Sequence, residues 1–114
     1  MIKEESLPGY NEGKLDALTT GANYAKVGLI DTRVQNNVMI RIFNLDASYS
    51  IKYKITGLIK SGGIEDEVVS ETVLSAGTDN TESLNTKYGH LVIYAKTNDA
   101  GETPAVGVVF NQRN

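Results

Sequence analysis

The sequence predicts an all-β domain, an antiparallel β-sandwich of immunoglobulin-like or jelly-roll-like type with an extended N-terminal arm. Two observations predict this fold. Polar and apolar residues alternate strictly over residues 49–56, and turn-forming residues separate this segment from several others of similar length. Short strands at this spacing, with almost no helical periodicity, are typical of two sheets packed face to face. A chain of 114 residues fits a single domain.

The strongest strand signal lies in residues 49–56. One side consists of Tyr49, Ile51, Tyr53 and Ile55, and the other of Ser50, Lys52, Lys54 and Thr56. Since successive side chains of a strand point to opposite faces, this pattern predicts a strand with one buried and one exposed face. Residues 37–45 follow the same rule, with Val38, Ile40 and Ile42 sharing one face.

Four further segments are expected to be strands: residues 25–33, 67–75, 88–96 and 105–110. Glycine-containing turns at residues 61–63 and 98–101 favour hairpin connections between them. The predicted core contains Ile40, Ile42, Ile51, Tyr53, Ile55, Val92, Ile93 and Val108, with Lys52, Lys54 and Lys96 at the surface. Tyr88, just before the penultimate strand, resembles the tyrosine corner of immunoglobulin-like domains.

Residues 1–24 differ from the sandwich domain predicted for residues 25–114. Their apolar residues are scattered and interrupted by proline and glycine, without a period of 2 or 3.6. We expect an extended arm that lies along a partner's surface, so that removing residues 1–20 leaves the sandwich folded and weakens assembly. The predicted partner-binding residues of the arm are Ile2, Leu7, Tyr10, Leu15 and Leu18.

Composition excludes several classes of protein. A net charge of −3 gives no electrostatic reason to expect nucleic acid or an anionic membrane as partner. Without cysteine the chain can form neither disulfides nor thiolate metal sites. The N-terminus carries acids where a signal peptide carries bases and an apolar run, so we expect no secretory export.

No motif for catalysis or phosphate binding is present, and we expect no enzyme activity, cofactor or metal. His90 is the only histidine, and a place at the edge of the core explains it better than a role as base or metal ligand. The carboxylates at residues 65–67 and Glu71 could supply a glycosidase pair, but a solvated acidic hairpin is the preferred interpretation.

Two other groups of polar residues are interpreted in the same way. Residues 79–82 and 98–102 carry oxygen ligands suitable for calcium, yet they lack the spacing of a calcium loop and are explained by turn formation. Lys52 and Lys54, with Lys60 beyond, form a basic stripe. Because strand alternation places Tyr49 and Tyr53 on the opposite face, no nucleic-acid platform is expected.

The strand series at residues 37–44, 53–57, 70–77 and 88–93 resembles the small β-sandwich virion proteins of tailed phages and related viruses, especially head-decoration and head–tail accessory proteins. The resemblance covers about residues 35–110. It implies a non-enzymatic capsid decoration or head-associated subunit without catalytic residues, whose arm reaches a neighbour. It also implies the viral major capsid protein or sister subunits as partners, a homo-oligomer or lattice, and location in the virion after synthesis in the host cytoplasm.

Two alternatives remain open. The first is a carbohydrate-binding or adhesion module, although the chain lacks the tryptophan that commonly stacks on sugars. The second is a subunit of a non-viral assembly such as a pilus or a surface layer, against which the missing signal peptide counts.

Overall fold

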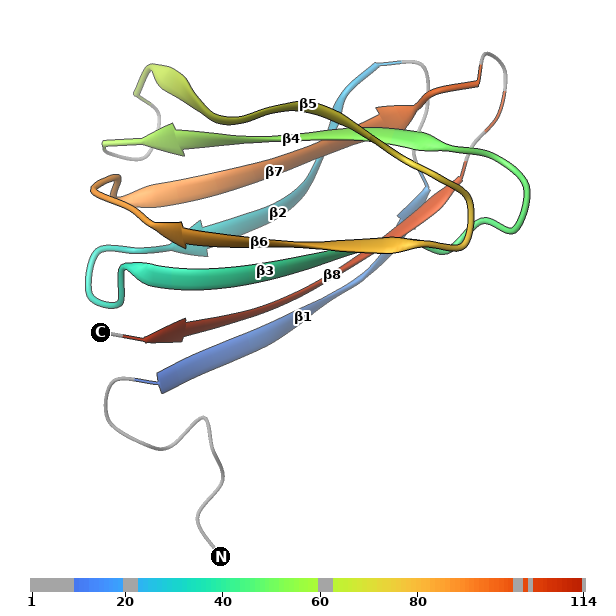
Figure 1. Ribbon diagram of the computed structural model, residues 1–114. Coiled ribbons are helices and arrows are strands. Elements are labelled where there is room, and N and C mark those ends of the chain that lie inside the picture. The colour runs from blue at the N-terminus through green and yellow to red at the C-terminus, as the bar shows by residue number, and fades with distance from the viewer. Residues whose placement is uncertain (1–9, 20–22, 60–62, 100–101, 103, 114) are drawn as a thin grey trace, which may run out of the picture.

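The computed structural model describes residues 23–59, 63–99, 102 and 104–113, together with the backbone of residues 10–19. Eight strands account for most of this part of the chain (Figure 1). They are β1 (Tyr10–Thr19), β2 (Ala25–Asp31), β3 (Asn37–Asn44), β4 (Ile51–Leu58), β5 (Glu65–Leu74), β6 (Asp79–Asn85), β7 (His90–Thr97) and β8 (Ala105–Arg113). Within the described residues no helix is long and apolar enough to cross a membrane.

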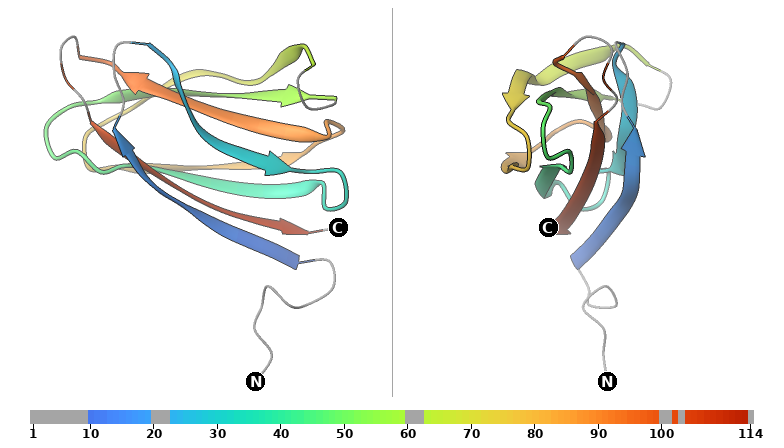
Figure 2. Two further views of the ribbon diagram at one scale, coloured as in Figure 1. Left: turned by 180° about the vertical axis from the view of Figure 1, so that it is seen from behind. Right: turned by 90° about the vertical axis from the view of Figure 1, so that its right-hand side faces the viewer.

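The strands form two antiparallel sheets, in the orders β1-β8-β3-β6 and β2-β7-β4-β5. Seen along the strands, the sheets face each other as two layers (Figure 2). Only β4 and β5 are consecutive strands paired in one sheet, because every other connection crosses to the opposite sheet. This order defines an eight-stranded jelly roll. The predicted β-sandwich is therefore confirmed, and it is of the jelly-roll type.

The core lies between the sheets, where the strand alternation places it. All eight residues predicted to form the core are buried. Around them lie Val27, Ile30, Val38, Leu74, Leu91, Ala95 and Val106. Lys52, Lys54 and Lys96 lie outside the core as expected, although each is half-buried. β4 begins at Ile51, so Tyr49 is an exposed loop residue rather than part of the predicted strand.

Tyr88 does not form a tyrosine corner. Its ring lies over Gly57, and its hydroxyl donates to the Asp66 carboxylate at 3.1 Å instead of to the backbone. A Cβ atom at Gly57 would come within 2.4 Å of the ring. The aromatic residue before β7 therefore covers a glycine in β4, and the immunoglobulin-like interpretation of this residue is wrong.

Two strands, β1 and β6, are not among those expected from the sequence. β1 pairs with β8, with Tyr10 opposite Arg113, Leu15 opposite Val108 and Leu18 opposite Val106. The second half of the predicted arm is thus an edge strand of the chain's own sheet. Ile2 and Leu7 fall outside the described residues, and contact of this segment with a neighbour remains a prediction.

Candidate interaction surface

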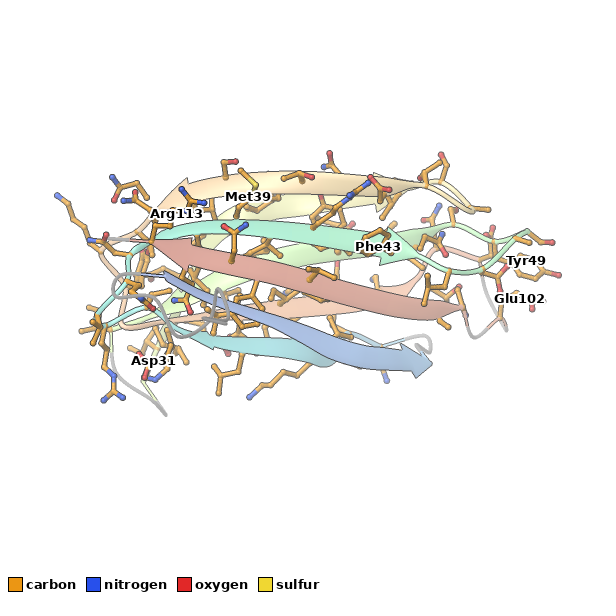
Figure 3. The ribbon with its side chains drawn as sticks, turned by 90° about the horizontal axis from the view of Figure 1, so that it is seen from below. Asp31, Met39, Phe43, Tyr49, Glu102 and Arg113 are labelled. Carbon is orange, nitrogen blue, oxygen red and sulfur yellow. The ribbon has the colours of Figure 1, made fainter. Side chains whose placement is uncertain are left out.

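The fold gathers three loops, the start of β1 and the end of β8 at one end of the sandwich, which we call the terminal end (Figure 1). The loops are residues 32–36, 59–64 and 86–89, of which 60–62 are not described. Asp31 and Arg113 lie at this end, and Tyr49 and Glu102 at the opposite one (Figure 3).

Backbone and side-chain hydrogen bonds tie these loops together. Thr32 N donates to Gly89 O at 2.9 Å, and Gly89 N donates to Leu58 O at 2.8 Å. The buried side chain of Gln112, on β8, donates to the main-chain oxygens of Asp31 at 2.6 Å and Gln35 at 3.0 Å. The loops therefore hold a fixed arrangement around the last residues of β8.

Three aliphatic side chains project into solvent from this end. Val34 is 83% exposed, Ile59 78% and Ile64 87%, which are the largest exposures among the described large hydrophobic residues. Single exposed aliphatic residues are common on protein surfaces, whereas several strongly exposed ones on the loops of one end suggest an interaction site. These residues cannot be found from the sequence alone, because nothing in a linear sequence brings loops 32–36 and 59–64 to the same end.

An open groove of about 640 Å³ lies at the terminal end, between the ends of β3, β6 and β8. Its lining contains the apolar residues Val38, Met39 and Leu84 and the polar residues Asn37, Ser83, Asn85, Asn111 and Arg113. Arg113, which lines this groove, pairs with Tyr10 at the start of β1. The groove is therefore a partly apolar surface near the described start of β1.

A cluster of tyrosines and lysines lies on the outer face of the β2-β7-β4-β5 sheet. The Lys54 ammonium is 4.5 Å from the ring centroid of Tyr24 and 5.5 Å from that of Tyr94. The Lys96 ammonium is 4.7 Å from the Tyr24 centroid. The expectation that strand alternation separates Tyr53 from Lys52 and Lys54 is confirmed. Tyr24 and Tyr94, which that expectation did not concern, lie beside the lysines.

Carboxylates complete this cluster. Tyr94 donates to Glu65 at 2.6 Å, and this hydrogen bond, with partial burial, raises the pKa of Tyr94 to about 12. Tyr24 donates to Glu71, and burial together with this hydrogen bond raises the pKa of Tyr24 well above its usual range. Lys52 pairs with Glu71 at 3.4 Å. Ammonium groups lie over the rings of Tyr24 and Tyr94, so a sugar that stacked there would have to displace a lysine.

His90 lies half-buried at the start of β7, opposite Asp31 and Leu58. Its Nδ1 atom is buried and has no hydrogen-bond partner among the described residues. The Asp31 carboxylate is held by Arg33 at 2.6 Å, and the hydrogen bonds from Arg33 keep the pKa of Asp31 well below its usual range. Asp31, the carboxylate beside His90, is thus already engaged by Arg33.

Most of the acidic residues considered for catalysis or calcium are engaged in structural contacts. Glu65 accepts from Thr56 at 2.5 Å, and Asp79 pairs with Arg41 at 3.0 Å. Asp99 accepts from Ser50 N at 3.0 Å and so links two loops. Across the described residues, no group of three or more histidine or acidic side chains could hold a metal ion.

No protein-family model and no curated protein sequence matches this chain. Solved structures match its fold. The crystal structure of PirA is similar with a TM-score of 0.59 and 9% identity, over 91% of this chain and 94% of that one. A subunit of the pili that form Bacillus endospore appendages is similar with a TM-score of 0.54 and 11% identity, over 92% and 88% of the two chains.

A chain of the T13 particle of infectious bursal disease virus is also similar, with a TM-score of 0.54 and 12% identity. The similarity covers 92% of this chain but only 31% of the viral one. At these identities the comparisons establish the fold alone. The jelly roll described here is thus a fold that a virion chain and a pilus subunit share.

Proposed function

We propose that this chain is a non-enzymatic virion structural protein, a capsid decoration or head-associated subunit whose terminal end binds neighbouring coat subunits. The observation that carries this proposal is the projection of Val34, Ile59 and Ile64 from the loops of that end. The groove lined by Arg113 lies at the same end. Contact of the predicted arm with a neighbouring subunit would add to binding there.

The energetics favour a partner at this end. Full burial of a valine or isoleucine side chain contributes about 1.5–3 kcal/mol. Three such side chains can offset part of the cost of association, which is about 4–15 kcal/mol. In a shell or lattice, symmetry repeats the contacts of each copy. Several small interfaces can then together offset the rest of the cost of association.

The fold and the chemistry are consistent with this role. The jelly roll recurs in a virion chain and in a pilus subunit. The acidic side chains that could support catalysis are held in hydrogen bonds and ion pairs. A carbohydrate-binding role gains less support, because lysines cover the rings of Tyr24 and Tyr94.

A matched pair of triple variants tests the proposal. The first variant carries Val34→Ser, Ile59→Ser and Ile64→Ser. The control carries Leu29→Ser, Val73→Ser and Val109→Ser, three exposed positions on the sheets. Co-sedimentation with coat shells of the same virus should fall strongly for the first variant and remain for the control. Undiminished binding of the first variant, with its fold intact, would contradict the proposal.

A further inference from the structure

The four edges of the two sheets differ in regularity. The pairing of β1 with β8 shifts register between Leu15 and Leu18, and that of β2 with β7 between Lys26 and Gly28. The pairing of β5 with β4 shifts twice. By contrast, β6 pairs with β3 at seven consecutive positions, from Asn85 to Asp79, without a shift. Bulges and irregularities are a common means of preventing sheet edges from pairing with other chains.

The β6 strand also lacks two other common protections, since its sequence contains no lysine and no proline. Its inward-facing charge, the Glu82 carboxylate, accepts a hydrogen bond from Tyr53 inside the sandwich. The exposed side chains along its middle and end are small and polar, namely Thr81, Ser83 and Asn85. A seven-residue regular edge of this kind is open to addition of another strand.

The direction of the backbone groups of β6 follows from its two ends. Asn44 N donates to Thr78 O at 2.9 Å, and Thr86 N donates to Asn36 O at 3.0 Å. Backbone groups of successive strand residues alternate in direction, so even-numbered residues of β6 face β3. The N–H and C=O groups of Asp79, Thr81, Ser83 and Asn85 therefore point to the open side of the sheet.

We infer that β6 is a self-association edge at which two copies of the chain pair antiparallel, with Ser83 opposite Ser83 of the second copy. The β1-β8-β3-β6 sheet of one copy and the same sheet of the second copy would then form one continuous eight-stranded sheet. Thr81 would lie opposite Asn85 of the second copy. Each hydrogen-bonded pair of residues in such a ladder exchanges two backbone hydrogen bonds.

The charges on the strand are compatible with this register and disfavour its neighbour centred on Glu82. Pairing centred on Glu82 would place two carboxylates directly opposite each other, which is unfavourable. Pairing centred on Ser83 places Glu82 opposite Leu84 and Asp79 opposite Lys87 of the second copy. Two-fold symmetry repeats both contacts, and the interface is closed after two copies. The inference does not depend on the virion assignment, because its partner is a second copy of the chain and the pairing uses the backbone of β6, although Ser83 and Asn85 also line the groove at the terminal end.

Single cysteines provide the test, since the chain has none of its own. In the register proposed, the two Cα atoms at position 83 would be about 5.5 Å apart, within the range for a disulfide. The Ser83→Cys variant should therefore form a covalent dimer on oxidation. Thr81→Cys is the matched control on the same face of the same strand. The two cysteines at position 81 of the dimer would be offset by four residues along the strands, about 13 Å, and should not cross-link.

Proline variants test the backbone pairing separately. Thr81→Pro removes an outward N–H without affecting the ladder to β3, and proline is tolerated at such edge positions. We expect sedimentation to show a dimer for the wild type and for Thr81→Ala, and a monomer for Thr81→Pro. If the Thr81→Pro variant unfolds, the comparison of cross-linking between Ser83→Cys and Thr81→Cys decides whether β6 is the self-association edge. Equal cross-linking at positions 81 and 83, a monomeric wild type at millimolar concentration, or open-ended polymers through β6 would overturn the inference.

Discussion

The hydroxyl of Tyr53 donates a 2.5 Å hydrogen bond to the carboxylate of Glu82 across the interior of the sandwich. Tyr53 is fully buried on β4, while Glu82 lies on β6 of the opposite sheet. The side-chain amide of Asn80 contacts the same hydroxyl at 2.5 Å. Burial and the contact with Glu82 raise the pKa of Tyr53. A polar contact therefore anchors the edge strand β6 to the core.

Replacing Tyr53 with phenylalanine should lower the free energy of unfolding by about 1.5–3 kcal/mol, the usual contribution of a hydrogen bond to a charged group. Chemical denaturation measures the change. Tyr49→Phe is the control, because Tyr49 is exposed in a loop and its change should stay within about 0.5 kcal/mol. Equal values for the two variants would show that the contact with Glu82 contributes nothing.

The same contact explains why the sequence did not predict β6. The residues that β6 turns inward are Asn80, Glu82 and Leu84, so the strand has no apolar face and no hydrophobic alternation. The polar residues on the inward face of β6 are explained only by the hydroxyl of Tyr53 on the opposite sheet. The segments 37–45 and 88–96, in contrast, carry regular isoleucine, valine and leucine positions, and the structure confirms both as strands.

The cluster of tyrosines and lysines on the outer face of the β2-β7-β4-β5 sheet was not predicted from the sequence for a similar reason. Alternation within residues 49–56 correctly separates Tyr53 from Lys54, but it says nothing about neighbouring strands. Tyr24 and Tyr94 come from other segments and lie beside Lys54 because of the sheet order. Such clusters follow from topology, which the pattern of a single strand does not contain.

Gly57 provides a second prediction. A Cβ atom at this position would overlap the ring of Tyr88, so Gly57→Ala should destabilise the fold by about 1–3 kcal/mol. Combining it with Tyr88→Ala should remove most of the added cost, since the overlap then disappears. A double-mutant cycle measures this coupling. Strict additivity of the two changes would contradict the packing described.

Stability should also fall at alkaline pH. The pKa of Tyr94 is raised to about 12, so the folded state holds this proton more tightly than the unfolded state does. The resulting stabilisation is complete below pH 10, the usual tyrosine range, and is lost as pH rises through about 12. Tyr94→Phe should flatten this part of the profile of unfolding free energy against pH. An unchanged slope would rule out the contact with Glu65 as its cause.

Two truncations separate the parts of the predicted arm. Removing residues 1–9 leaves β1 in place and should change stability by less than about 0.5 kcal/mol while weakening assembly. Removing residues 1–20 also deletes β1 and exposes the edge of β8, so it should destabilise the fold, contrary to the expectation from sequence. Thermal unfolding and co-sedimentation measure the two effects. Full assembly after removal of residues 1–9 would exclude this segment as an arm.

Hydrogen–deuterium exchange of the free and the shell-bound protein tests the central claim most directly. Binding through the terminal end should slow exchange in residues 32–36, 59–64 and 86–89 and leave the loop around Tyr49 unchanged. Protection confined to the outer face of the β2-β7-β4-β5 sheet, with no change in those three loops, would contradict the account.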